Sequence, residues 1–291
     1  MAGNNLVELK TKLGADSVKK KFEDMLGKRA PQFMTSITSV VQNSDLLQKA
    51  DVNSIIMGAA TAASMDLPLN PNLGYAALVP FNSKKGCFAQ LQIMTKGWTE
   101  LFLRTGQCKS LINEVVYEGQ LVKKNKFTGE YVFDEDAKKS NKIIGYMAYF
   151  KLTNGYEKTE YMTVEEVKAH AQRFSQTYRS GAGIWKEDFD AMSKKTVLKK
   201  LLTKWAPKSI EIQMAATFDQ GVIKGNVENF EQATVDYEDM QGESKRAVKP
   251  VEVVEPTTVV DLGESQDVQS PSVQAPDADA PVDADALPFG E

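Results

Sequence analysis

The chain has 291 residues, 42% hydrophobic and 25% charged with a net charge of −4, so it can bury a sizeable core in one large domain or two small ones. No apolar run approaches the ~18 residues that a membrane-spanning helix needs, and residues 1–13 lack the continuous apolar stretch of a signal peptide. Two cysteines, Cys87 and Cys108, are too few for a disulfide framework or a four-cysteine zinc site, so we expect a reduced compartment, the cytoplasm.

The N-terminal part is predicted to be helical because its apolar residues recur at spacings of three to five. Three segments show this pattern: residues 4–26, interrupted or capped at Asp16–Ser17; residues 31–41, opened by Pro31; and residues 55–63, capped by Asp51 or Asn53. Small residues in the third segment permit close packing against neighbouring elements.

The middle of the chain changes to the pattern of strands separated by turns. Strands are predicted over residues 75–80, 88–94, 115–122, 130–133, 143–151 and 156–162, with a short helix over residues 96–104. Turn signals stand at residues 70–74 and 82–86 and at Asn154-Gly155. We therefore expect an α+β fold with a helical N-terminal part, a small antiparallel sheet and helices that back it.

Two helices separated by a loop are predicted to follow the sheet. Thr163 and Glu166 form a capping box that opens a helix near residue 164, and residues 175–183 have the composition of a flexible loop. The last helix is predicted from residue 185 or 186 to residue 205, with Val197, Leu198, Leu201, Leu202 and Trp205 as its apolar stripe. Lys194 projects onto the middle of that stripe, so it must reach past the stripe to solvent, pair with a carboxylate or meet a ligand phosphate.

The net charge conceals an uneven distribution along the chain. Residues 225–291 carry 16 acidic and 3 basic side chains, whereas residues 1–224 carry 32 basic and 23 acidic ones. The C-terminal segment is rich in Val, Pro, Ser, Ala and acidic residues and shows no periodicity, so we expect residues 225–291 to form a mostly disordered acidic tail on a core of residues 1–224. A basic body with an acidic tail is typical of proteins that bind polyanions.

No constellation of residues points clearly to an enzyme. The single histidine, His170, is interpreted as a surface residue of a helix, and the chain contains no phosphate-binding loop of the form G-x-x-x-x-G-K-[ST]. Carboxylates gather at residues 134–136 and at Asp188 and Asp190, and the latter pair could hold metal in a DNA nuclease. We expect a protein without catalytic residues, metal or cofactor, and keep a metal-dependent nuclease as an alternative.

Basic residues with aromatic residues between them are the stronger signal, because cations neutralise phosphates and aromatic faces stack on unpaired bases. The side chains expected to contact DNA are Lys96, Arg104, Lys109, Arg173, Arg179, Lys194, Lys195, Lys199 and Lys200. The aromatic residues expected to stack on bases are Trp98, Phe174, Tyr178 and Trp185. Lysine runs also occur on solvated helix faces, so a non-enzymatic phage assembly protein that binds an acidic partner stays open as a second alternative.

Several linked motifs follow one another over about residues 30–220. They are Leu67-Pro68-Leu69-Asn70-Pro71, Gly74-Tyr75-Ala76, Val79-Pro80-Phe81, Gln90-Leu91-Gln92, Lys96-Gly97, Arg104-Thr105-Gly106, Trp185, Met192-Ser193-Lys194-Lys195-Thr196, Lys199-Lys200-Leu201 and Ser209-Ile210-Glu211-Ile212-Gln213. In order and spacing they resemble the RecT family of phage single-strand annealing proteins. One departure is Thr95, which stands where relatives often carry an aromatic residue.

The resemblance implies a small antiparallel sheet backed by helices. It also implies binding of single-stranded DNA and of an annealed duplex intermediate, and assembly into a ring or helical filament that pairs complementary strands without ATP. A bacterial host and a phage exonuclease that supplies single strands are the implied setting and partner. We expect the N-terminal helices to join adjacent subunits.

The end of the acidic tail has a resemblance of its own. Residues 283–289, Asp-Ala-Asp-Ala-Leu-Pro-Phe, resemble the acidic tip of bacterial single-strand-binding proteins, although Gly290 and Glu291 follow the phenylalanine here. A shared partner, including the host single-strand-binding protein, is therefore one hypothesis. A second hypothesis is that the tail competes with DNA for the basic surface of the core.

Overall fold

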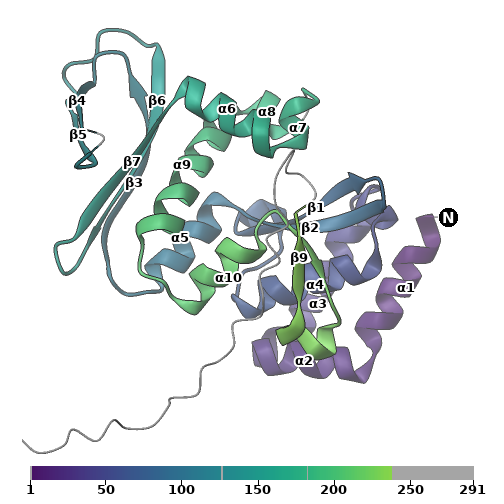
Figure 1. Cartoon of the computed structure of the whole chain (residues 1–291). Helices are drawn as coiled ribbons and strands as arrows, with labels where there is room; N and C mark the ends of the chain where they lie inside the picture. The colour runs from purple at the N-terminus through teal and green to yellow at the C-terminus, as the bar shows by residue number, and fades with distance from the viewer. Residues whose placement is uncertain (1, 126, 182, 238–291) are drawn as a thin grey trace, which may run out of the picture. The chain divides into compact units, whose positions relative to one another are not determined.

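The computed structural model describes residues 2–125, 127–181 and 183–237, and the acidic segment from residue 238 onward lies outside these residues (Figure 1). The N-terminal part is helical, as the apolar spacing predicts, and comprises α1 (Ala2–Gly14), α2 (Asp16–Leu26), η1 (Gly27–Arg29), α3 (Ala30–Gln42), η2 (Leu47–Lys49) and α4 (Val52–Ser64). The predicted cap of α4 is confirmed, because the Asp51 carboxylate accepts a hydrogen bond from the Ser54 amide at 2.8 Å.

The small residues of α4 let it pack closely against a four-stranded antiparallel sheet. Its strands are β1 (Ala76–Ser83), β2 (Gly86–Ile93), β8 (Val222–Lys224) and β9 (Thr234–Asp236), in the order β1-β2-β8-β9. The short 3-10 helix η3 (Pro71–Leu73) precedes β1. A Cβ at Gly58 of α4 would lie only 2.8 Å from the Leu78 side chain of β1, so a larger residue there would separate the helix from the sheet.

The core extends beyond the boundary that composition predicts at residue 225. The segment after β8 forms η4 (Val227–Gln232) and then β9, and Val222, Ile223 and Val227 are buried. The Tyr237 hydroxyl donates to the Thr217 carbonyl. The prediction that the disordered tail begins at residue 225 is therefore wrong for residues 225–237, because these residues form a 3-10 helix and a strand that are too short to give a periodic signal.

A second sheet of three antiparallel strands has the order β3-β6-β7 and stands beside a two-stranded hairpin. The elements are α5 (Thr95–Leu103), β3 (Cys108–Tyr117), β4 (Leu121–Asn125), β5 (Glu130–Phe133), β6 (Ile143–Leu152) and β7 (Glu157–Thr163). The single strand predicted over residues 115–122 is wrong. Its two halves belong to β3 and β4, because the chain turns at Gly119, whose φ of 96° disfavours a side chain.

The C-terminal helices are α6 (Val164–Phe174), α7 (Gln176–Arg179), α8 (Ile184–Glu187), α9 (Phe189–Trp205) and α10 (Ile210–Phe218). The capping box at Thr163 and Glu166 is confirmed. The predicted flexible loop after α6 contains α7, and the predicted last helix is divided at Asp188, whose backbone leaves the helical region and whose side chain caps α9.

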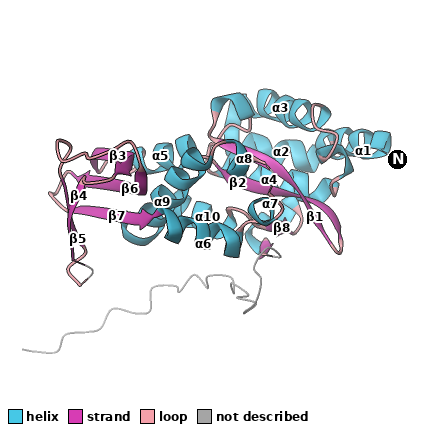
Figure 2. Ribbon diagram, turned by 90° about the horizontal axis from the view of Figure 1, so that it is seen from above, coloured by secondary structure: helices cyan, strands magenta, loops and turns pink. Residues whose placement is uncertain are grey.

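Helix α9 is the element on which the rest of the C-terminal half is organised. Its buried residues Val197, Leu198, Leu201 and Leu202 pack against β6, β7 and α5, which confirms most of the predicted apolar stripe. Figure 2 shows α5, α9 and α10 between the β3-β6-β7 sheet and the sheet that covers α4. The α+β class with small antiparallel sheets is confirmed, and no helix within the described residues is long and apolar enough to span a membrane.

Candidate nucleic-acid interface

Positive side chains from α6 and α9 converge on the single histidine. Burial, and after it the positive charges of Lys199, Lys200 and Arg173 in that order of effect, together lower the pKa of His170 to about 4. The Phe174 ring lies 4.6 Å from the His170 ring, and the Arg173 guanidinium lies 5.0 Å from the Phe174 ring. Three predicted DNA contacts therefore act electrostatically on an imidazole that is neutral at pH 7 and half-buried, which the sequence interpretation as a surface residue missed. We call these five side chains the α6–α9 cluster.

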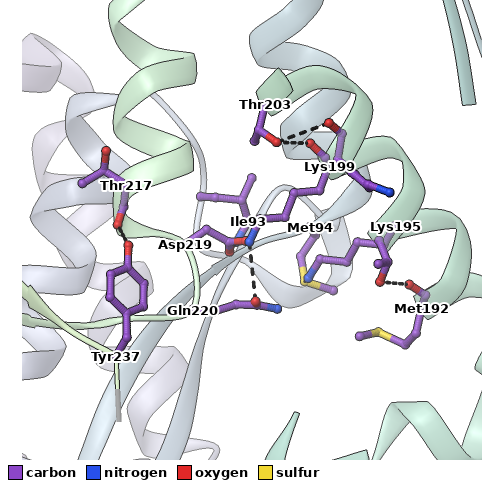
Figure 3. A network of polar contacts seen from close by, with 12 residues as sticks. Ile93, Met94, Met192, Lys195, Lys199, Thr203, Thr217, Asp219, Gln220 and Tyr237 are labelled. Carbon is purple, nitrogen blue, oxygen red and sulfur yellow. Dashed lines mark hydrogen bonds and ion pairs between the residues drawn. The ribbon is translucent and has the colours of Figure 1, made fainter. Parts of the chain in front are cut away.

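One lysine of the α6–α9 cluster is held by a buried carboxylate (Figure 3). The Lys199 ammonium lies 2.5 Å from Asp219 Oδ2, and Asp219 Oδ1 accepts a hydrogen bond from the Ile93 amide at 2.7 Å. Asp219 is only 2% exposed, whereas the Lys199 side chain is 27% exposed. The pair ties α9 to the end of β2, so Lys199 has a structural partner in addition to any ligand.

The structure buries Lys195, one of the two preceding lysines that were predicted to contact DNA. Lys195 is 4% exposed, and its ammonium has the Met94 sulfur at 3.7 Å as its hydrogen-bond partner. Burial lowers the pKa of Lys195, although Asp219 opposes that shift. The Lys195 side of α9 is covered by the junction of β2 and α5, whereas Lys194, predicted to lie on the apolar stripe, stays half-exposed. Lys195 therefore cannot reach DNA in this conformation.

Of the two lysines that α9 contributes to the cluster, Lys200 is the more exposed. Its ammonium lies 2.7 Å from a Glu160 carboxylate oxygen, yet its side chain is 46% exposed, while that of Glu160 is 12% exposed. An ammonium has three donors, so Lys200 can keep this pair and still bind a phosphate.

Arg104 is occupied by the fold. Its guanidinium donates to the carbonyls of Met65 and Asp66 at 2.8 and 3.1 Å and pairs with Glu100 at 3.0 Å, so it closes the C-terminal end of α4. Arg179 likewise donates to the carbonyls of Gln172 and Arg173 at the end of α6. The structure thus gives both arginines a capping role that their sequence pattern did not indicate.

The remaining predicted cations are accessible. Lys96 and Lys109 are exposed, and neither forms an ion pair with a carboxylate among the residues that the structure describes. They lie at the start of α5 and of β3, and within the described part of the chain neither side chain forms a hydrogen bond or an ion pair with the α6–α9 cluster. Their contact with DNA stays a prediction.

The four predicted stacking residues differ in accessibility. Trp98 is fully buried and Trp185 is 7% exposed, so neither presents a ring face to a base in this conformation, and the stacking prediction for both is corrected. Tyr178 packs edge-on against Trp185 with ring centroids 5.6 Å apart and is half-buried. Phe174 is also half-buried, so these two rings are the ones within reach of a ligand.

Sequence reasoning missed an aromatic residue at the end of α9. Trp205 is half-buried, and the ammonium groups of Lys158 and Lys204 lie 4.6 and 4.8 Å from its ring centroid. The neighbouring positions of Lys204 and Trp205 were visible in the sequence, but the approach of Lys158 from β7 depends on tertiary packing.

The carboxylates of the nuclease alternative have structural partners. Asp188 accepts from the Ala191 amide at 2.9 Å, and Asp190 accepts from the Tyr146 hydroxyl at 2.5 Å. Among residues 2–125, 127–181 and 183–237, no three His, Cys, Asp or Glu side chains are grouped so that they could hold a metal ion.

Comparison with known proteins adds two findings. The family model described as the RecT family matches residues 31–238, from the start of α3 to one residue beyond the described core. The chain is also 46% identical over 207 residues to the uncharacterized protein YqaK of Bacillus subtilis (strain 168). That alignment covers 71% of this chain and 70% of the relative.

Proposed function

Because the chain belongs to the RecT family of single-strand annealing proteins, which act in DNA recombination, we propose that it coats single-stranded DNA and pairs it with a complementary strand without ATP, metal or catalytic chemistry of its own. The observation that supports this proposal most is a set of basic side chains on α6 and α9, Arg173, Lys199 and Lys200, whose positive charges all lower the pKa of His170. A group of like charges with incomplete compensation is stabilised by an anion, and a sugar-phosphate chain supplies anions in a row.

In the proposed mechanism the protein holds the phosphates and leaves every base that is not stacked on an aromatic ring free to pair. Arg173 and Lys200 contact the DNA backbone at the α6–α9 cluster, and Lys194 contacts it about 1.7 turns earlier on α9. Lys96 and Lys109 extend the contact on α5 and β3. Phe174 and Tyr178 limit the motion of the strand by stacking. Because the contacts are to phosphates, binding is independent of sequence and weakens steeply with salt.

Annealing further requires that neighbouring subunits continue the same track. We propose that the helices α1 to α3 join subunits into a ring or a filament, so that one strand is presented over many subunits to a second strand. The single strands would come from a phage exonuclease, and the host single-strand-binding protein is a further proposed partner. The competition between tail and DNA concerns residues outside the described part of the chain and stays a prediction.

The test is annealing of two complementary oligonucleotides by the full chain, without ATP and with magnesium present. Product formation above the spontaneous rate supports the proposal, while cleavage of the strands favours the nuclease alternative. Failure to shift single-stranded DNA in a gel favours an assembly protein with an acidic partner. The double variant Arg173→Gln/Lys200→Gln should lower the slope of log K against log salt by about 1.4, and Lys139→Gln/Lys142→Gln, at two exposed lysines between β5 and β6, should leave it unchanged.

A further inference from the structure

The C-terminal end of α9 carries an aromatic ring that two lysines cover. Trp205 packs against the core along one edge, while the ammonium groups of Lys158 on β7 and Lys204 on α9 each lie within 5 Å of its ring centroid. Neither lysine pairs with a carboxylate in the described part of the chain. Two positive charges therefore share one neutral partner.

Stability does not explain this arrangement. A cation over an aromatic ring is held weakly where solvent reaches it, and two ammonium groups near one ring repel each other. The indole Nε1 of Trp205 is buried without a hydrogen-bond partner among the described residues, a state that native structures avoid unless another demand prevails. A side chain without an N–H group would avoid the unsatisfied donor, so the indole and its lysines suit another task.

The surroundings favour an anion. Lys200 lies one helical turn before Lys204 and belongs to the α6–α9 cluster, and it already uses the nearby carboxylate of Glu160. Lys208 follows α9 and donates to the Thr203 carbonyl at the end of the helix. The positive charge that begins at the cluster therefore continues along α9 to Trp205.

We propose that Trp205 is a stacking site for an unpaired nucleobase and that Lys158 and Lys204 shield it until phosphates draw them away. The proposal deepens the function proposed above and rests on it. Lysine stems are flexible, so both ammonium groups can leave the ring for the phosphates that flank a nucleotide. The uncovered ring face then stacks on the base of that nucleotide. A duplex cannot use this site, since its bases are already stacked.

Tryptophan fluorescence of the full chain tests the proposal, because the two other tryptophans, Trp98 and Trp185, are 0% and 7% exposed. Single-stranded oligonucleotide should quench the wild-type emission, and Trp205→Phe should lose most of that quenching. Duplex of the same length and polyglutamate should quench weakly. Trp205→Leu should bind single strands about tenfold more weakly.

The shielding lysines have their own variant and control. Lys158→Gln/Lys204→Gln should lower the salt slope by about 1.4, and the matched pair Lys139→Gln/Lys142→Gln between β5 and β6 should not. Quenching that persists in Trp205→Phe overturns the proposal, as does equal quenching by duplex. Quenching by polyglutamate as strong as that by DNA would assign the site to an acidic peptide instead. If Trp205→Leu fails to fold, Trp205→Phe and the lysine pair still decide the question.

The two proposals fail in different ways. A wild-type protein that neither binds nor anneals single strands refutes the proposed function. If the wild-type protein anneals normally, and the Trp205 variants keep its fluorescence quenching and its single-strand affinity, only the stacking site is refuted.

Discussion

Replacing Asp219 by asparagine tests the central ion pair of the fold. The substitution keeps an oxygen that can accept the hydrogen bond from the Ile93 amide, but it removes the negative charge 2.5 Å from the Lys199 ammonium. Removing one partner of a buried pair costs about 3–5 kcal/mol of unfolding free energy, because the other charge is left without compensation. The Lys199 side chain is 27% exposed, so we expect the low end of that range, about 3 kcal/mol.

Urea unfolding followed by circular dichroism measures this loss. With an m-value of about 2–3 kcal/mol/M, the midpoint of Asp219→Asn should fall by about 1 M. Asp236→Asn is the matched control, since Asp236 pairs with Lys224 at 2.6 Å but is 30% exposed. That control should cost about 0–1 kcal/mol.

A double-mutant cycle with Lys199→Met separates the pair from its surroundings. The double variant should be more stable than the sum of the two single losses predicts, by about 2 kcal/mol, because the uncompensated charge is absent. A loss below about 1 kcal/mol in Asp219→Asn together with additive behaviour would show that Lys199 is solvated and free, and would refute the structural role assigned to it.

Three further predictions concern the other residues of the interface. Arg104→Met should lower the unfolding free energy by about 1–3 kcal/mol through loss of its bonds to two backbone carbonyls, with single-strand affinity measured at folded concentrations unchanged. Lys195→Met should keep or raise stability, because a buried ammonium beside a thioether is exchanged for an apolar side chain, and a tenfold loss of DNA affinity in a folded variant would contradict that assignment. The pKa of His170 is lowered to about 4 in the folded protein, so folding favours the neutral imidazole. The unfolding free energy should therefore fall by about 1–3 kcal/mol as the pH is lowered from 6.5 to 4. Denaturant titrations of His170→Gln over that range should show a shallower pH dependence, and an equal slope would rule out this titration.

Local patterns predicted much of the fold. The helix cap at Asp51, the capping box at Thr163 and the turn at Asn154-Gly155 depend on residues close in sequence, and the structure has the expected elements at each. Elements fixed by distant contacts were not predictable in the same way. The strands β8 and β9 have three residues each, too few for a periodic signal, and they exist because β2 supplies an edge for pairing.

The candidate site was predictable in composition but not in detail. The basic residues around α6 and α9 were identified from their density, and the charges of three of them lower the pKa of His170. A helical wheel assigned Lys194 to the buried face because it treats α9 as packed on one side, whereas the junction of β2 and α5 also covers Lys195. The contact of Lys158 with Trp205 joins β7 to α9 and could not be inferred from either segment alone.

The adjacent lysines of α9 illustrate how a charge scan can mislead. Lys195 sits inside the protein, Lys199 holds a carboxylate of the C-terminal segment, and Lys200 reaches solvent. Alanine at each position would reduce the yield of DNA complex, but through cavity formation, loss of a tether and loss of a phosphate contact respectively. If DNA binding is measured without correction for the fraction of folded protein, the three lysines would be ranked as equally important. Of the three, only Lys200 has a side chain exposed enough to contact a DNA strand.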